Sequence, residues 1–166
     1  MITAEVQACM HLRNMWGRLV PHFKYFGHDW GTLWVFVTTY EGVSLSSVAK
    51  NKGGLTSTIK DKARAALREL HANGVVHGDP ALRNVLWRER DQSVIWVDFE
   101  LATVGGENFH ALAASELVEF EKELSLVHTV EETDIVFAEM APVKKKRTSA
   151  KVCCCPAPGS RQLSSH

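Results

Sequence analysis

Apolar residues recur along much of this chain with the spacing of amphipathic helices. The pattern predicts helices over residues 3–15, 59–72 and 109–127, since their apolar positions return every three or four residues. Ser57 or Thr58 is placed to cap the second of these helices. The predicted buried positions are Ile59, Ala63, Ala66, Leu67 and Leu70 in the second helix and Leu112, Leu117, Phe120, Leu124 and Val127 in the third, while Lys60 falls on the wet face.

Other segments follow the composition of strands. Residues 32–38 form an unbroken run of β-branched and aromatic side chains, which predicts a strand buried on both faces. A shorter strand is expected over residues 23–26. Residues 75–103 contain two apolar stretches around a polar break at 88–93, which predicts a hairpin.

Composition and charge narrow the class of protein. The 166 residues fit one domain with a tail. The net charge is zero, so the protein has no overall electrostatic attraction to nucleic acid or to an anionic membrane. The N-terminus lacks the pattern of a signal peptide, and no apolar run approaches the roughly 18 residues that a membrane span needs. We therefore expect an intracellular, most simply cytoplasmic, protein without a transmembrane segment or a nucleic-acid partner.

The C-terminal part changes in composition. Residues 129–140 predict a weak amphipathic helix, and residues 141–166 predict a disordered tail because they hold few large apolar groups. The basic run at 144–147 leaves nuclear import open as an alternative location. The three adjacent cysteines at 153–155 leave S-acylation open, and their spacing argues against a zinc site or a disulfide framework.

The hairpin region carries a pattern of acids and an amide that suits a magnesium–phosphate site. Asp79 precedes the first strand of the hairpin, Asn84 follows five residues later, and Asp98 ends the second strand. Magnesium prefers oxygen ligands and keeps several waters, so one or two side chains are enough to hold it. A carboxylate on the same turn can accept a proton from a bound hydroxyl group. We expect His77 to be a packed structural histidine that bonds the backbone near Asp98 and not a catalytic base.

These residues resemble the catalytic motifs of protein kinases. H-G-D-P-A-L-R-N is similar to the catalytic loop H-R-D-x-x-x-x-N, and V-D-F-E resembles the D-F-G magnesium motif. The H-G-D form is also similar to aminoglycoside and choline phosphotransferases and to fungal kinase-like domains. The resemblance implies an α+β, kinase-like fold over residues 1–128, with a partial N-lobe (a helix plus its last strands) and a reduced helical C-lobe with a catalytic-loop hairpin.

The same resemblance implies roles for single residues. Asp79 would be the catalytic base, with Arg83 orienting the substrate or the base itself. Asn84 and Asp98 would hold Mg²⁺. The implied contacts with ATP are Glu5 as the ion-pair partner of a phosphate-binding lysine and the hinge residues Thr39, Tyr40, Glu41 and Gly42 against the adenine.

Three departures from the kinase pattern keep alternatives open. Gly78 replaces the arginine of H-R-D, so control through a phosphorylated activation loop is not expected. Glu100 replaces the glycine of D-F-G, which removes backbone freedom at that turn. The chain contains no G-x-G-x-x-G loop and no lysine strand before the first helix, so we expect an N-terminally incomplete kinase unit.

Two functional classes follow from these features. The first is an ATP- and Mg²⁺-dependent phosphotransferase acting on a hydroxyl group, where Arg83 favours a protein Ser/Thr acceptor and Gly78 a small molecule of the aminoglycoside or choline type. The second is a truncated pseudokinase that serves as a binding module.

Overall fold

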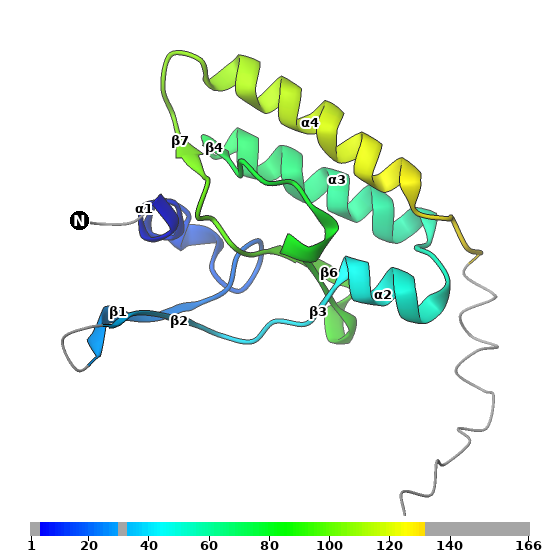
Figure 1. The fold of residues 1–166 in the computed structure, drawn as a ribbon, viewed down its shortest axis with the longest axis horizontal. Helices are drawn as coiled ribbons and strands as arrows, with labels where there is room; N and C mark the ends of the chain where they lie inside the picture. The colour runs from blue at the N-terminus through cyan, green and yellow to red at the C-terminus, as the bar shows by residue number, and fades with distance from the viewer. Residues whose placement is uncertain (1–3, 30–32, 132–166) are drawn as a thin grey trace, which may run out of the picture.

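The computed structural model describes residues 4–29 and 33–131, which form four α-helices and seven short strands (Figure 1). The helices are α1 (Ala4–His11), α2 (Leu45–Lys52), α3 (Ser57–Ala72) and α4 (Phe109–Leu126), with 3-10 turns η1 (Arg13–Met15), η2 (Leu82–Asn84) and η3 (Glu89–Asp91). The strands are β1 (Phe23–Asp29), β2 (Leu33–Thr38), β3 (Val43–Ser44), β4 (Val75–Val76), β5 (Val85–Arg88), β6 (Ser93–Trp96) and β7 (Thr103–Val104). The predicted helix 129–140 and tail 141–166 lie outside the described residues, apart from 129–131.

The strands form three small antiparallel sheets. β1 pairs with β2, β3–β5–β6 form a three-stranded sheet, and β4 pairs with β7. Helices α3 and α4 lie side by side on one side of the molecule, and the β1–β2 hairpin projects on the opposite side below α1 (Figure 1). β5 and β6 are the hairpin predicted within residues 75–103, and the pair β4–β7 closes this segment at its two ends.

Helix α3 confirms the predicted element but corrects two details of it. Thr56, and not Ser57 or Thr58, caps the helix, since its hydroxyl accepts a hydrogen bond from the backbone N–H of Ile59 at 3.2 Å. Lys60 is buried rather than wet, because its Nζ donates to the carbonyl of Val127 at 2.6 Å and to the hydroxyl of Thr129 at 2.8 Å. The residues after α4 therefore pack back onto the start of α3.

The strand β2 is where the sequence pattern misled most. The apolar run predicted a strand buried on both faces, but Trp34 is 54% exposed and Val37 is 40% exposed. The reason is that the described residues leave these two side chains uncovered, whereas Phe36 and Thr38 line a small cavity together with residues of α1. Its aromatic rings pack mainly on each other, as in the stacked pair Phe26–Trp34 at 5.0 Å.

Helix α4 ends within one residue of its predicted boundary and has a narrower buried face than predicted. Phe120 and Leu124 are buried as expected, whereas Leu112 is 43% exposed. The ring of Phe120 lies 5.2 Å from the fully buried ring of Trp96 on β6. This contact ties α4 to the hairpin.

The first predicted helix is also shorter than expected. Helix α1 ends at His11, and the 3-10 turn η1 follows it before the chain turns at Gly17.

The core therefore lies between α3, α4 and the β5–β6 hairpin, with α1 packed alongside. No helix in the described part of the chain is long and apolar enough to cross a bilayer.

Candidate functional site

The imidazole of His77 is the centre of the candidate site. It is completely buried, its Nε2 lies 2.8 Å from the carbonyl oxygen of Val97, and its Nδ1 lies 3.3 Å from the backbone nitrogen of Asp79. Burial lowers the pKa of His77, which keeps the ring neutral near pH 7. A carbonyl only accepts and an amide only donates, so both bonds require the tautomer with its proton on Nε2. This confirms the expectation from sequence that His77 packs as a structural histidine next to Asp98.

The carboxylate of Asp79 is held from one side. Its Oδ2 accepts from Arg83 at 2.5 Å and from the amide nitrogen of Asn84 at 2.9 Å. Asn84 is buried, and its amide nitrogen also donates to the backbone carbonyl of Asp79 at 3.1 Å. These bonds leave Oδ1 of Asp79 without a hydrogen-bond donor among the described residues. The short turn η2 makes this geometry, since it brings residue 84 back over residue 79.

Asp98 follows the second strand of the hairpin, β6, and its neighbour Val97 is bonded to Asn84. The backbone N–H of Val97 donates to the carbonyl of Asn84 at 3.0 Å, so Asp98 follows directly on a residue that is bonded to both Asn84 and His77. Asp98 adopts φ 67°, a left-handed conformation that is costly for a residue other than glycine. Its carboxylate is exposed and receives no hydrogen bond from the described residues. Nothing in V-D-F-E signals this strained conformation.

Glu5 on α1 lies near Asp98. Both residues line a small cavity of about 90 Å³ between α1, the end of β2 and the segment after β6. Burial raises the pKa of Glu5, and the nearby carboxylates of Asp98 and Glu100 raise it further. No cation pairs with Glu5 among the described residues.

The four predicted hinge residues lie apart from this cavity. Tyr40, Glu41 and Gly42 line a separate hollow of about 300 Å³ next to Trp87 and Arg88. The side chain of Tyr40 is 84% exposed, while the carboxylate of Glu41 is buried and paired with Arg88 at 2.7 Å. Thr39 hydrogen-bonds to Glu41 at 2.5 Å. Within this linker the side chain of Tyr40 is therefore open to a ligand, whereas the side chains of Thr39 and Glu41 are engaged within the protein.

Glu116 is a site residue that the sequence reasoning missed. It sits on α4, is 4% exposed, and accepts from the backbone N–H groups of His77 at 3.1 Å and Gly78 at 2.6 Å. The ring nitrogen Nε2 of His71 lies 2.6 Å from the same carboxylate. Glu116 thus fixes the start of the catalytic-loop segment from α4. Its helical position on the apolar side, between Ala113 and Phe120, was the available signal.

The backbone explains why glycine stands at position 78. Gly78 has φ 82°, and a Cβ built there would lie 2.2 Å from the carbonyl oxygen of Leu101. An arginine at this position is excluded by both constraints. Glu100, by contrast, has no positive φ, so the backbone conformation at this position does not require a glycine.

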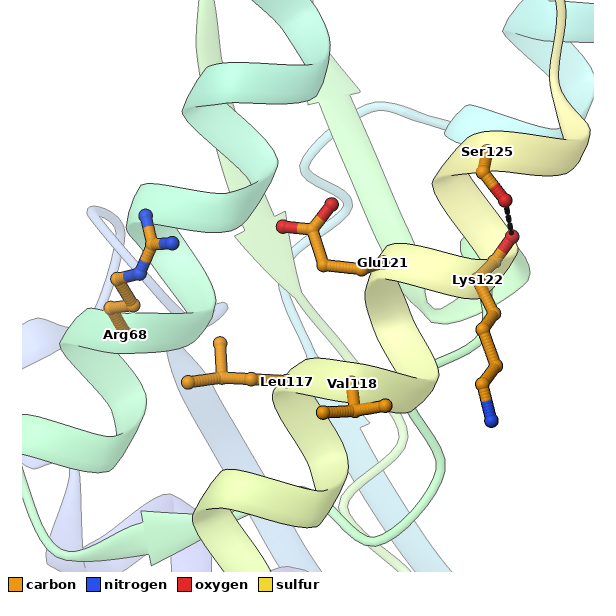
Figure 2. Close-up of a pocket in the computed structure, with 6 residues that line it drawn as sticks. All are labelled: Arg68, Leu117, Val118, Glu121, Lys122 and Ser125. Atoms are coloured by element: carbon orange, nitrogen blue, oxygen red, sulfur yellow. Dashed lines mark hydrogen bonds between the residues drawn. The ribbon is translucent and has the colours of Figure 1, made fainter.

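A larger hollow of about 390 Å³ lies between α3 and α4, away from these residues. Figure 2 shows Arg68 of α3 facing a row of α4 side chains. None of the predicted site residues lines it.

Among the described residues, no group of three or more His, Cys, Asp and Glu side chains is placed to hold a metal ion.

Comparisons with known proteins support the fold. The kinase PK-1 of Cydia pomonella granulovirus superposes on this chain with a TM-score of 0.53 at 16% sequence identity, over 83% of this chain and 61% of that chain. The yeast RNA Pol II CTD kinase CTDK-1 complex gives a TM-score of 0.49 at 17% identity, over 63% of this chain and 36% of that one. No protein-family model and no curated protein matches the sequence. The chain has a partial kinase-like α+β fold and spans 61% of the PK-1 chain.

We expect Glu116→Gln to destabilise the protein by about 2 kcal/mol, because two backbone N–H groups and His71 lose a charged acceptor. Chemical denaturation measures the change. Glu119→Gln on the exposed face of the same helix is the matched control and should stay within about 0.5 kcal/mol of the parent protein. Equal effects of the two substitutions would contradict the anchoring role of Glu116.

Gly78→Ala should lower the free energy of unfolding by more than Gly53→Ala. Both positions have positive φ, which costs an alanine about 1–2 kcal/mol. Only Gly78 also meets a backbone atom, since no atom lies within 4 Å of a Cβ at Gly53. The difference between the two melting or urea midpoints therefore isolates the contact with Leu101, and no difference would argue against it.

Proposed function

We propose that this chain is a kinase-type phosphotransferase that transfers the γ-phosphoryl group of ATP to an acceptor hydroxyl with the help of Mg²⁺. The observation that carries the proposal is that hydrogen bonds of the buried His77 and of the Val97 backbone link the segment with Asp79 and Asn84 to the residue just before Asp98. The kinase-like fold is independent support for it.

The donor set suits magnesium. The amide nitrogen of Asn84 is engaged with Asp79, which leaves its oxygen as a ligand, and the carboxylate of Asp98 is exposed without a donor among the described residues. These are the hard oxygen ligands that Mg²⁺ prefers. When bound, the ion would neutralise charge on the phosphate groups of the nucleotide.

Asp79 is the proposed base. Its Oδ1 is free to accept the proton of an acceptor hydroxyl as the oxygen of that hydroxyl bonds to the γ-phosphorus and the bond from phosphorus to the ADP oxygen breaks. Arg83 and Asn84 keep the other oxygen occupied and thereby fix the direction of the carboxylate. Arg83 is exposed, with 64% of its side chain accessible, so it can also contact the acceptor.

A protein Ser/Thr hydroxyl is the acceptor that we favour on the strength of Arg83, and a small molecule is the alternative that Gly78 favours.

A second candidate function is a kinase-like binding module without catalysis. The half-buried carboxylate of Glu5 favours it, because no cation among the described residues pairs with it to position phosphates. The partly exposed aromatic face of β1–β2 offers such a module a contact surface.

Two substitutions separate these functions. Asp98→Asn should weaken Mg²⁺-dependent ATP binding at least about tenfold, because a hard anionic ligand is lost. Asp79→Asn should leave binding nearly unchanged and lower phosphoryl transfer by about 10²–10⁴-fold. Calorimetric titration measures binding, and release of ADP with a peptide or small-molecule acceptor measures transfer.

Asp61→Asn, on the exposed face of α3, is the control and should change neither quantity. Absence of Mg²⁺-dependent binding by the parent protein at millimolar ATP would rule out the enzyme and leave the binding module.

A further inference from the structure

The guanidinium group of Arg88 joins three separate segments of the chain. Nη1 donates to the carbonyl of Gly17 at 2.8 Å and to Glu41 at 2.7 Å, while Nε donates to Asp91 at 2.9 Å and to Ser93 at 3.0 Å. Arg88 is 7% exposed and its bond to Glu41 is buried, whereas its partner Asp91 is exposed. A planar guanidinium is the side chain best suited to hold several acceptors in fixed directions.

The carboxylate of Glu41 completes the network. Its second oxygen accepts from the hydroxyl of Thr39, and the backbone of Thr39 is bonded to the carbonyl of His22 at 3.0 Å. Burial alone would raise the pKa of Glu41, but the hydrogen bonds from Thr39 and Arg88 hold that pKa below its ordinary value. Glu41 therefore stays ionised at neutral pH inside the structure.

The location of these bonds gives them a consequence for the site. Gly17 and His22 lie on the connection that enters the β1–β2 hairpin, and residues 39–42 form the connection that leaves it. Arg88 ends β5, the strand that begins directly after Asn84. The network thus links both connections of the β1–β2 hairpin to the strand that positions the candidate magnesium ligand.

We propose that Arg88 is a positioning residue that clamps the linker 39–42 against the catalytic hairpin through Glu41. The clamp presets the distance between the linker backbone and the Asn84–Asp98 end of the site. Its consequence for ATP binding rests on the proposed function, whereas its consequence for the linker does not.

The neighbouring strand pairing fixes only the far end of this linker. Val43 pairs with Trp87, and a Cβ at Gly42 would lie 2.2 Å from the carbonyl oxygen of Trp87, so the chain is already held there. Thr39 and Glu41 lie upstream of that contact. From the hairpin side Arg88 bonds Glu41 at 2.7 Å, while the guanidinium of Arg90 lies farther from it, at 3.8 Å.

The test replaces the pair by apolar residues in the double variant Glu41→Leu/Arg88→Met. Such replacements of buried ion pairs often leave the free energy of unfolding unchanged. A change in linker exchange in this variant would then report lost positioning and not lost stability. We expect the backbone amides of residues 39–41, 17–20 and 22 to exchange with deuterium about tenfold faster than in the parent protein, with exchange elsewhere unchanged. Binding of Mg-ATP should weaken by a similar factor.

The matched control is Arg64→Met/Glu121→Leu, which removes the ion pair between α3 and α4 and should leave linker exchange unchanged. Arg88→Lys keeps the charge without the fork and provides a second variant if the apolar pair does not fold; it should also speed linker exchange. Unchanged exchange at residues 39–41 in the folded variants would overturn the clamp. If the parent protein binds no ATP, the proposed function fails, and the exchange rates still decide the clamp.

Discussion

The candidate site depends on one buried group, the neutral imidazole of His77. Its two nitrogens face opposite partners, the N–H of Asp79 in the loop and the carbonyl of Val97 in the following strand. Burial lowers the pKa of the ring and keeps it neutral, and the two hydrogen bonds then require the tautomer with its proton on Nε2. The catalytic-loop segment and the strand that carries Asp98 are therefore positioned relative to each other by a group that touches neither acid side chain.

Residues of α4 and of the hairpin itself support this ring. Glu116 on α4 accepts the N–H groups of His77 and Gly78, and the ring of Trp96 packs at 4.9 Å from the imidazole. On the far side, Arg88 ties the end of β5 to Glu41 and Gly17. Polar groups on a loop keep a fixed geometry when buried bonds of this kind surround them, which is the condition that positioned acid–base chemistry needs.

Much of this arrangement could be predicted from the sequence because it is local. The spacing of Asp79, Asn84 and Asp98 around a hairpin, the structural role of His77 and the extent of α3 and α4 all follow from short-range patterns. The uncovered β2, the burial of Lys60 and the inward side chain of Glu41 could not be predicted, since each depends on a partner far along the chain. Glu116 belongs to the same group, because a single acid on an apolar helix face does not reveal which N–H groups it will meet.

The central claim is that His77 brings Asn84 and Asp98 together as one magnesium site. The most direct measurement is paramagnetic line broadening in the amide NMR spectrum, with Mn²⁺ in place of Mg²⁺ and ATP present. The account predicts that signals from residues 77–84 and 97–100 broaden first and recover on addition of excess Mg²⁺. Broadening that starts elsewhere, or that leaves either of these segments unaffected, would contradict it.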